Sequence, residues 1–346
     1  MLENESYART FGAESLAPYL TRTLVSRGAL LHNYYGIGHA SLDNYIALVS
    51  GQAPNQATQL DCPKYVEFVL ARPKLDANGQ AIGTGCVYPS MVHMIGDQLE
   101  TAHFTWRGYM EDLGNDTTKE VAACGHPTIG GIDSTTNREA SDLYATKHNP
   151  FYYFRTLIDN HARCAARVVN LRQLPADLAS IKTTPNYVFI TPNQCNDGHD
   201  APCAGGAPGG LTQADKFLRE WVPRITESPA FKADGLLLIT FDEAGGLGGQ
   251  DTSACCGERG LPGQARPPGY TGAGGGRVGA VILSPFVRPG TVSDVAYNHY
   301  STLRWVEDEF GLRHLGYAAD KLRTFGTDVF GRTRKRQPQR PSSHGQ

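Results

Sequence analysis

The sequence predicts an α/β protein of three layers, with helices on both faces of a mostly parallel sheet. Short apolar runs typical of buried strands alternate with longer segments whose apolar residues recur at helical spacing. Polar residues gather directly after the apolar runs, where the carboxyl ends of parallel strands would meet. With 346 residues and 40% hydrophobic residues, the chain is long enough to bury a large core. Strands separated by helices favour parallel pairing with cover on both faces.

Four apolar runs are expected to form buried strands, and three segments between and after them are expected to form helices. The expected strands span residues 30–34, 187–191, 236–241 and 278–283. The expected helices span residues 41–50, 211–226 and 299–311. The expected strands are continuous apolar runs, whereas the apolar residues of the expected helices recur at helical spacing.

Charge and hydropathy exclude two broad classes. The net charge is −2, and no basic stripe lies outside the last dozen residues, so nucleic acid is not an expected partner. No run reaches the roughly 18 consecutive apolar residues of a membrane span, so no integral membrane segment is expected. Residues 1–325 are expected to form one catalytic domain, and the basic, proline-rich segment 326–346 is expected to be disordered.

Eight cysteines point to disulfides and to an oxidising compartment. They are Cys62, Cys86, Cys124, Cys164, Cys195, Cys203, Cys255 and Cys256. None forms the C-x2-C pair that nucleates a zinc site, and most lie in polar loops. Cys195 and Cys203 are the most local candidate pair. The chain is therefore expected to be secreted or periplasmic, and a cytosolic protein with scattered thiols is the alternative.

Ser41 stands where an apolar run turns into the expected helix 41–50. One interpretation is an N-cap, because serine is favoured there for bonding the free N–H groups of the first turn. The other is a nucleophile, because the same N–H groups and the helix dipole stabilise a developing alkoxide and an incoming phosphate. The residue alone does not choose between them.

Two further strand ends carry clustered polar residues. Asp197, His199 and Asp200 follow the strand 187–191, and this setting favours a ligand or acid/base role for the histidine. Asp242 and Glu243 directly follow the next expected strand. Two carboxylates at such a place are costly to bury unless a cation compensates, so metal ligation is the main hypothesis. The alternative is that both point into solvent.

Two other features near the strand ends have mainly structural interpretations. His299 begins the expected helix 299–311 and is expected to pack, with Asn298 or Ser301 as the cap. The Gly/Pro-rich segment 244–276 is too long for a simple connection. It is expected either to form a lid or pocket wall, tethered by Cys255 and Cys256, or to be a disordered surface insertion.

The order of the polar blocks resembles one protein family. The blocks are ENESYARTFG, GHASLDNYIALVSGQ, TWRGYMEDL, KHNPFYYF, FITPNQCNDGHD, ITFDEAGG and VILSPFVRPG. In this order they resemble the phosphoesterase family, which unites bacterial acid phosphatases with phospholipases C. That family shares an α/β/α core of the alkaline-phosphatase type, and the resemblance spans roughly residues 1–320.

The resemblance implies a metal site and a nucleophile. By matching blocks, one divalent cation is held by Glu3, Asn4, Asp242 and Glu243, with Ser41 also in its shell. Ser41 is implied as the phosphate-accepting nucleophile. His199 matches a pocket histidine that contacts phosphate, and His148 in the block KHNPF is a second candidate.

Three more residues have supporting roles in this interpretation. His39 lies two residues before the nucleophile and is expected to stand behind the ligands. Asp197 and Asp200 are expected to orient His199 rather than to bind metal. Carboxylates with an amide suit Mg²⁺, Ca²⁺ or Mn²⁺, and nearby histidines would admit Zn²⁺ or iron, so the ion's identity stays open.

The implied activity is hydrolysis of a phosphate monoester by way of a phosphoserine at Ser41. A small phosphate ester or a phospholipid would be the substrate. A phospholipase C type of phosphodiesterase is one alternative, and a catalytically inactive binding module with the same fold is another. Phosphoryl transfer needs mainly an in-line nucleophile and positive charge on the equatorial oxygens, which this set of residues can supply.

The start of the chain raises a separate expectation. In the family the Glu–Asn pair follows the first, central strand, whereas here only Met1 and Leu2 precede Glu3. We therefore expect a strand and a signal peptide to lie upstream of the written start.

Overall fold

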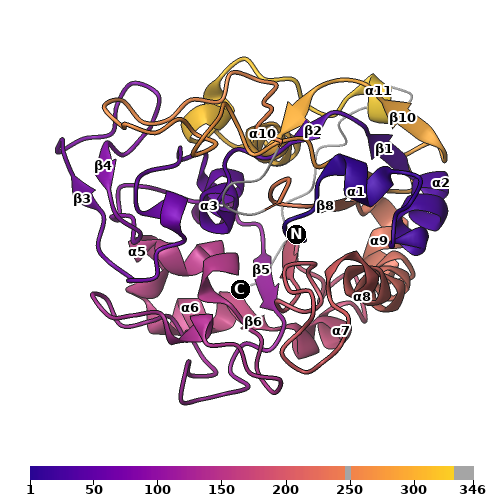
Figure 1. The fold of residues 1–346 in the computed structure, drawn as a ribbon, viewed down its shortest axis with the longest axis horizontal. Helices are drawn as coiled ribbons and strands as arrows, with labels where there is room; N and C mark the ends of the chain where they lie inside the picture. The colour runs from indigo at the N-terminus through magenta and orange to yellow at the C-terminus, as the bar shows by residue number, and fades with distance from the viewer. Residues whose placement is uncertain (246–250, 331–346) are drawn as a thin grey trace, which may run out of the picture.

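The computed structural model describes residues 1–245 and 251–330, which form an α/β fold around a twisted sheet in two parts (Figure 1). One part has the strand order β10-β1-β9-β8, and the other has the order β6-β5-β7. The first part consists of β1 (Ala29–Leu31), β8 (Leu237–Thr240), β9 (Ala280–Leu283) and β10 (Thr291–Ser293). The second consists of β5 (Trp106–Met110), β6 (Val168–Asn170) and β7 (Tyr187–Thr191). Two short pairs, β2 (Tyr34–Tyr35) with β11 (Tyr297–Asn298) and β3 (Val69–Leu70) with β4 (Gly83–Thr84), lie outside them.

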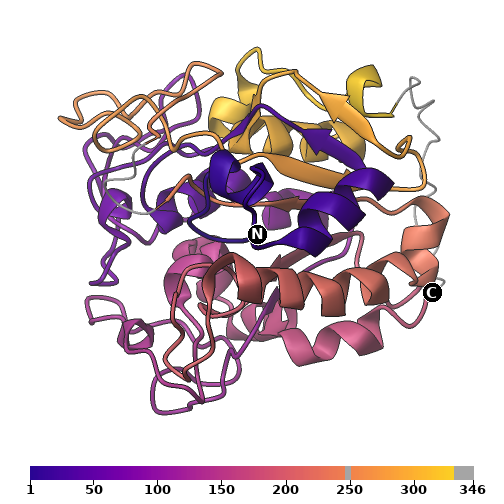
Figure 2. The same cartoon turned by 45° about the vertical axis from the view of Figure 1, so that its right-hand side comes forward.

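The first two residues of the chain lie between the two parts of the sheet. Leu2 forms a parallel bridge with Phe241 at the end of β8. On the other side, the amino group of Met1 donates to the carbonyl of Ile190 in β7 at 2.9 Å. The mark of the N-terminus accordingly lies near the middle of the molecule in Figures 1 and 2. Met1 and Leu2 thus join β8 to β7, and the residues that follow them emerge at the carboxyl ends of these strands.

Helices cover both faces of the sheet, as alternating side chains of β5 demonstrate. Trp106 and Met110 enter a core with the helix α3 (Ser41–Ser50), whereas Tyr109 enters a separate core with α8 (Gly210–Thr226). Successive side chains of a strand point to opposite faces, so these two helices lie on opposite sides. The three-layer α/β/α arrangement is thereby confirmed, and α8 runs across the front of the molecule in Figure 2.

The other helices are shorter, apart from α10 (His299–Phe310), which packs against α3. They are α1 (Tyr7–Phe11), α2 (Val25–Arg27), α4 (Ile95–Thr101), α5 (Arg155–Ile158), α6 (His161–Arg167), α7 (Leu174–Asp177), α9 (Pro229–Asp234) and α11 (Thr327–Phe330). A π-helical turn, η1 (Tyr19–Leu24), packs on α8. None of the described helices combines the length and the apolar character needed to cross a membrane.

Most expected elements are present, some with bounds shifted by one or two residues, and the structure differs from the expectation in the points that follow. The helix 41–50 and the strand 187–191 have the expected bounds. The expected strand 30–34 is split into β1 and β2, because the chain turns at residues 32 and 33 and the two pieces pair with different strands. The sheet is parallel within β6-β5-β7, but β9 runs antiparallel to both β1 and β8. The central strand β5 was not expected at all.

Four disulfides confirm the interpretation of the cysteines. The pairs are Cys62–Cys86, Cys124–Cys164, Cys195–Cys203 and Cys255–Cys256. The local pair of Cys195 with Cys203 is as expected. The tether expected from Cys255 and Cys256 is wrong, because these adjacent residues bond to each other and not to another segment. Four disulfides indicate an oxidising compartment.

Ordered structure continues beyond the expected domain end at residue 325. The helix α11 begins at Thr327, and Val329 is fully buried in the core beside β9. The expectation of disorder is therefore wrong for residues 326–330, because the apolar side chains there complete a core. Residues 331–346 of the expected tail lie outside the described residues.

Candidate active site

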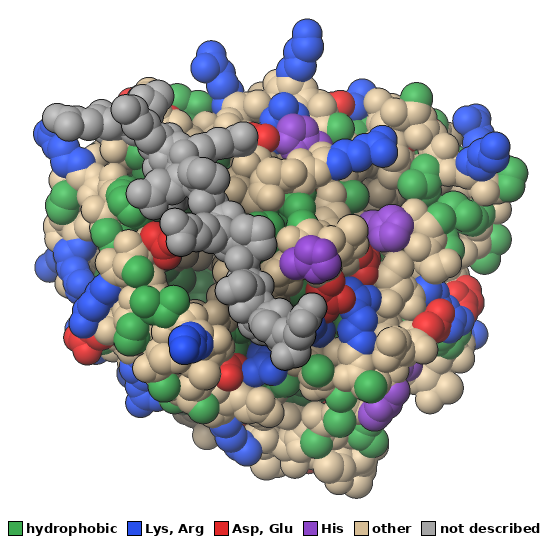
Figure 3. Space-filling model, turned by 180° about the vertical axis from the view of Figure 1, so that it is seen from behind, with side chains coloured by type: hydrophobic (Ala, Val, Ile, Leu, Met, Phe, Trp, Pro, Cys, Tyr) green, Lys and Arg blue, Asp and Glu red, His purple; other side chains and the backbone are tan. Residues whose placement is uncertain are grey.

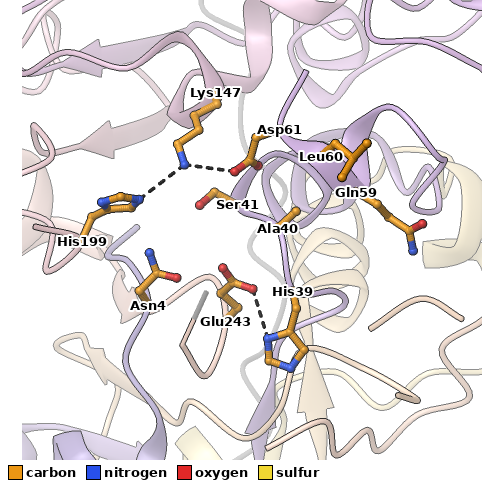
Figure 4. A pocket seen from close by; sticks show the side chains of 10 residues that line it. All are labelled: Asn4, His39, Ala40, Ser41, Gln59, Leu60, Asp61, Lys147, His199 and Glu243. Atoms are coloured by element: carbon orange, nitrogen blue, oxygen red, sulfur yellow. Dashed lines mark hydrogen bonds and ion pairs between the residues drawn. The ribbon is translucent and has the colours of Figure 1, made fainter. Parts of the chain in front are cut away.

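A cavity of about 170 Å³ opens at the carboxyl ends of the central strands (Figure 4). It is lined by Asn4, His39, Ala40, Ser41, Gln59, Leu60, Asp61, Lys147, His199 and Glu243. In Figure 4, Ser41 lies in the middle of this set, with Lys147 and Asp61 on one side and Asn4 and Glu243 on the other. On the face shown in Figure 3, histidine, acidic and basic side chains lie close together near the middle, whereas other Lys and Arg side chains are dispersed.

Ser41 is the first residue of α3, and a neighbouring side chain fixes the loop that presents it. The Asn44 side chain accepts hydrogen bonds from the N–H groups of Ile37 and Gly38, at 2.6 and 3.1 Å. Its amide group also donates to the carbonyls of Gly38 and Ala40, at 2.9 and 3.0 Å. Asn44 is a functional residue that sequence reasoning missed; its type and its place in the first turn after the loop were the available signal.

The Ser41 hydroxyl does not cap the helix. The N-cap position is Ala40, and the Oγ–H of Ser41 instead donates to Oε2 of Glu3 at 2.7 Å. The other oxygen of Glu3 accepts from the hydroxyl of Tyr45 at 2.5 Å, one turn further along α3. The N-cap interpretation of Ser41 is therefore wrong, and its hydroxyl is directed at a buried carboxylate.

Asn4 and Asp242 are held together by the backbone at the join of the two sheet parts. Asn4 adopts a left-handed conformation, with φ 59°, and its N–H donates to Oδ1 of Asp242 at 2.9 Å. The second oxygen of Asp242 and the side-chain oxygen of Asn4 are both buried, and neither has a hydrogen-bond partner among the described residues. Buried polar atoms are ordinarily paired, so two such oxygens suggest a missing partner.

His148 and Asp197 form a second group with Glu3. Nε2 of His148 lies 3.4 Å from Oε2 of Glu3, and its Nδ1 lies 3.2 Å from Oδ2 of Asp197. One ligand atom from each of the three residues lies within 4.8 Å of the others, so together they could hold a metal ion. His148 is buried beneath the cavity and does not line it. The expected contact of His148 with phosphate is therefore not supported by its position.

The carboxyl groups here repel one another in the absence of a cation. Burial raises the pKa of Glu3 well above its usual range, and the charges of Asp242 and Asp197 raise it further. Burial likewise raises the pKa of Asp197 well above its usual range and that of Asp242 to about 6. A divalent cation would replace the missing positive charge, and oxygen donors with one imidazole are suitable ligands. The residues present therefore fit a metal ion.

Glu243 faces the cavity and contacts His39. Nδ1 of His39 lies 3.2 Å from Oε2 of Glu243, and both side chains are buried. The two ring nitrogens of His39 also lie 2.9 Å from the carbonyls of Gly245 and Asp251. His39 thus stands behind a proposed ligand, as expected, and contacts two residues near the start of the segment 244–276.

The remaining described residues of that segment contact a residue of the cavity but do not line it. The side-chain amide of Gln59 donates to the carbonyls of Pro267 and Pro268, at 2.7 and 3.3 Å. Gln59 and His39 are thus two of the residues that anchor this segment to the rest of the fold. Residues 246–250 of the expected lid or wall lie outside the described residues.

His199 lines the cavity and is oriented by Asp200. Nδ1 of His199 lies 2.8 Å from Oδ1 of Asp200, which also pairs with Arg138 at 2.8 Å. The ring therefore donates through Nδ1 and presents Nε2 as an acceptor. Burial lowers the pKa of His199, so the ring is neutral near pH 7. Asp197 contacts the backbone N–H of His199 at 2.7 Å and not its ring, so only Asp200 orients the ring as expected.

Lys147 and Asp61 are cavity residues that sequence reasoning missed. Nζ of Lys147 donates to Oδ2 of Asp61 at 3.0 Å and lies 3.4 Å from Nε2 of His199. Burial acts to lower the pKa of Lys147, but the charges of Asp61 and Glu3 outweigh it, and the pKa lies above its usual range. The cavity therefore contains a permanent ammonium. A lysine beside the KHNPF histidine was the available signal.

His299 has the structural role expected of it. Its Nε2 donates to the carbonyl of Asp242 at 2.7 Å, while Nδ1 lies 3.2 Å from the hydroxyl of Tyr34. Burial lowers the pKa of His299 to about 4, so the ring is neutral. Asn298 caps the helix by accepting from the N–H of Ser301.

The chain is similar to a known protein family and to several phosphatases. The family model of the phosphoesterase family matches residues 11–313. A probable acid phosphatase of Kluyveromyces lactis is 29% identical over 322 residues, covering 91% of this chain and 58% of that protein. An acid phosphatase of Aspergillus fumigatus is 26% identical, with 91% and 54% covered. The chain thus spans little more than half the length of these two relatives.

A third relative matches over most of its length. A phosphatidylinositol-3-phosphatase of Mycobacterium tuberculosis is 23% identical, with 95% of this chain and 80% of that protein covered. Among solved structures, an alkaline-phosphatase-superfamily protein of Vibrio parahaemolyticus has a TM-score of 0.50 at 11% identity, covering 95% of this chain and 70% of that chain. This likeness confirms the alkaline-phosphatase type of fold. Because the family model covers nearly the whole chain, we conclude that the chain belongs to the phosphoesterase family.

Proposed function

We propose that this chain hydrolyses phosphate monoesters, with Ser41 as the nucleophile and with the help of a divalent cation. The observation that carries the proposal is the bond of 2.7 Å from the Ser41 hydroxyl to Glu3, in a cavity shared with His199. Acid phosphatases among the relatives support the same reaction class.

The cation would be held by the expected set Glu3, Asn4, Asp242 and Glu243, with Ser41 also in its shell and with Asp197 and His148 as further candidate ligands. The unpartnered buried oxygens of Asn4, Asp242, Glu243 and Asp197 support this assignment, as do the raised carboxyl pKa values. When bound, such an ion neutralises phosphate charge and makes a hydroxyl more acidic.

The side chains supply the remaining steps. A bond forms between Oγ of Ser41 and phosphorus while the bond from phosphorus to the ester oxygen breaks, and the hydroxyl proton passes to Glu3. Water then attacks the phosphoserine and gives a proton to Nε2 of His199, which carries no hydrogen and would exchange its 3.4 Å contact with Lys147 for the water. The bond from phosphorus to Oγ breaks, and Oγ regains its proton from Glu3, while the proton on His199 passes by way of solvent to the alkoxide released in the first step.

The setting of the reaction follows from the rest of the chain. We place the catalytic domain in residues 1–330, which include α11. Four disulfides support export to an oxidising compartment, and among the expected locations both secretion and the periplasm agree with them.

Replacement of the nucleophile tests the covalent step. The variant Ser41→Ala should release no phosphate from p-nitrophenyl phosphate above the rate without enzyme, because Tyr45, the other described residue whose hydroxyl donates to Glu3, does not line the cavity. The exposed Ser26→Ala variant is the matched control and should keep full activity. Acid quenching during turnover should trap a phosphoserine only in the control. Turnover by Ser41→Ala with metal bound would contradict the proposed mechanism.

A lipid headgroup is a second candidate for the alcohol part of the substrate. The relative that acts on phosphatidylinositol 3-phosphate covers nearly the whole chain, which favours this candidate. A substrate panel decides: release of inorganic phosphate from either substrate class supports a monoesterase. Release of a phosphorylated headgroup would instead identify the phospholipase C type, and no turnover with any metal would identify a binding module.

A further inference from the structure

Lys147 is the one ammonium group that lines the cavity, as far as the described residues extend. It lies in a short 3₁₀ turn, Thr146–His148, and reaches over Ser41 from the side opposite Asn4 and Glu243 (Figure 4). Its side chain is 16% exposed and lines the cavity, so most of it is shielded from bulk solvent. A cation in this place adds to whatever charge a metal ion supplies on the other side of Ser41.

Asp61 holds Lys147 in position. Oδ2 of Asp61 accepts from Nζ at 3.0 Å, and Oδ1 accepts from the N–H of Leu42 at 2.9 Å. The same carboxylate therefore links the ammonium to the first turn of the helix that carries Ser41. Asp61 itself has φ 57° and precedes Cys62, whose disulfide to Cys86 anchors the loop. One N–H group of the first turn, that of Leu42, is therefore already bonded to Asp61.

The ammonium has room for one more partner. An ammonium group donates three hydrogen bonds, and Nζ of Lys147 has two partners among the described residues, Asp61 and Nε2 of His199. Nε2 of His199 is an acceptor because Nδ1 bonds Asp200. A phosphoryl oxygen in the cavity would complete the set.

This geometry distinguishes two classes of phosphate ester. A monoester has three non-bridging oxygens and two negative charges near neutral pH, whereas a diester has two such oxygens and one charge. In a cavity of about 170 Å³ a second ester group would have to take the place next to Ser41 that a third oxygen otherwise occupies. A fixed cation there stabilises the dianion more strongly than the monoanion.

We infer that Lys147, positioned by Asp61, binds a non-bridging oxygen of the substrate and makes this site selective for dianionic monoesters over diesters. The inference rests on the proposed function and extends it by naming the charge state of the phosphate that the cavity recognises.

The test compares Lys147→Met with the exposed Lys182→Met as a matched control. The substrates are p-nitrophenyl phosphate and bis(p-nitrophenyl) phosphate. We expect Lys147→Met to lower kcat/KM for the monoester about 10- to 100-fold and that for the diester far less, so that the ratio of the two falls. The inhibition constant of inorganic phosphate should rise by a similar factor. Asp61→Asn should shift both quantities in the same direction but less.

The result that would overturn the inference is an equal loss for both esters, with an unchanged inhibition constant for phosphate. If the wild-type protein has no measurable diesterase activity, the inhibition constant alone decides. Thermal unfolding and bound-metal content of each variant, compared with the control, identify a variant that has merely failed to fold. Failure of the proposed function would give a different result, because wild type and Ser41→Ala would then be equally inactive on the monoester.

Discussion

Glu307 is a buried carboxyl group remote from the proposed chemistry, and its charge state links folding to pH. Oε1 accepts from the N–H of Leu315 at 2.8 Å, whereas Oε2 is buried without a hydrogen-bond partner among the described residues. Burial raises the pKa of Glu307 from its ordinary 4.5 to about 9. The folded protein therefore keeps this group protonated at neutral pH, when the unfolded chain does not.

The variant Glu307→Gln should separate this effect from the rest of the molecule. Below pH 4.5 Glu307 is protonated in both states, and its contribution to stability is fully present. As pH rises towards 9 only the unfolded state ionises, so wild type loses up to about 1.4 kcal/mol per pH unit relative to the variant.

Urea unfolding at pH 4.5 and pH 8 checks this prediction. Glu307→Gln should match wild type at the lower pH and exceed it at the higher one. The exposed Glu14→Gln variant serves as the control and should follow wild type at both values. The same difference between Glu307→Gln and wild type at both pH values would contradict the assignment.

At the scale of single residues, the sequence predicted the site residues that directly follow apolar runs. It missed the site residues that come together only in the folded chain. Ser41 and Glu243 stand directly after or near expected strands, and both line the cavity. Lys147 and Asp61 are 86 positions apart, and neither follows an expected strand. A single charge in a loop is ordinarily solvated, so only the folded chain reveals their contact.

At the scale of the element, the helix α3 depends on the turn before it. The Asn44 side chain makes four hydrogen bonds within residues 37–40. Net contributions of about 1 kcal/mol each lead us to expect that Asn44→Ala destabilises the protein by roughly 2–4 kcal/mol. It should also lower kcat more than it changes KM, because Ser41 loses its fixed position.

Denaturant unfolding and steady-state kinetics test the role of Asn44. The exposed Asn78→Ala variant controls for loss of an asparagine elsewhere in a turn. If Asn44→Ala had the denaturant midpoint and the kcat of wild type, the backbone alone would maintain the turn.

Helices and strands were predicted correctly where one local sequence pattern was strong. They were missed where pairing with distant strands determines the structure. The strand β7 is a continuous apolar run of β-branched and aromatic residues, and its bounds were expected. The strand β5, WRGYM, contains Arg107 and Gly108 and lacks such a run. It is a strand because it pairs with β6 and β7 on either side, a condition that no local pattern reports.

At the scale of the whole molecule, the proposed cation should act as a stabilising ligand. An ion that binds only the folded state adds about 2.7 kcal/mol at a concentration 100 times its dissociation constant. Chelation should therefore lower the midpoint of thermal unfolding, and added Mg²⁺, Ca²⁺, Mn²⁺ or Zn²⁺ should restore it for the ion that fits. This measurement does not depend on activity.

The matched variant for this experiment is Asp242→Asn. It should lose most of the metal-induced shift, because it removes one charge from the buried set, while Ser41→Ala should keep most of it. A midpoint that is identical with chelator and with every added ion would contradict a metal site here.

The layered architecture was predictable as a whole, but the order of its strands was not. Alternating strand and helix patterns are enough to predict three layers. In the order β10-β1-β9-β8, the strand β1 pairs with β10 and β9, both of which lie more than 200 residues further along the chain. The antiparallel β9 follows a long Gly/Pro-rich segment, so the usual right-handed crossover rule did not apply to it.

The join at Met1 and Leu2 has a mechanical consequence. Asp197 and His199 follow β7 on one side of it, and Asp242 and Glu243 follow β8 on the other. An ion bound by Asp197 on one side and by Asp242 and Glu243 on the other would cross-link the two parts of the sheet. Its removal would then loosen both parts at once, and amide hydrogen exchange should speed up in β7 and β8 together rather than at the cavity alone.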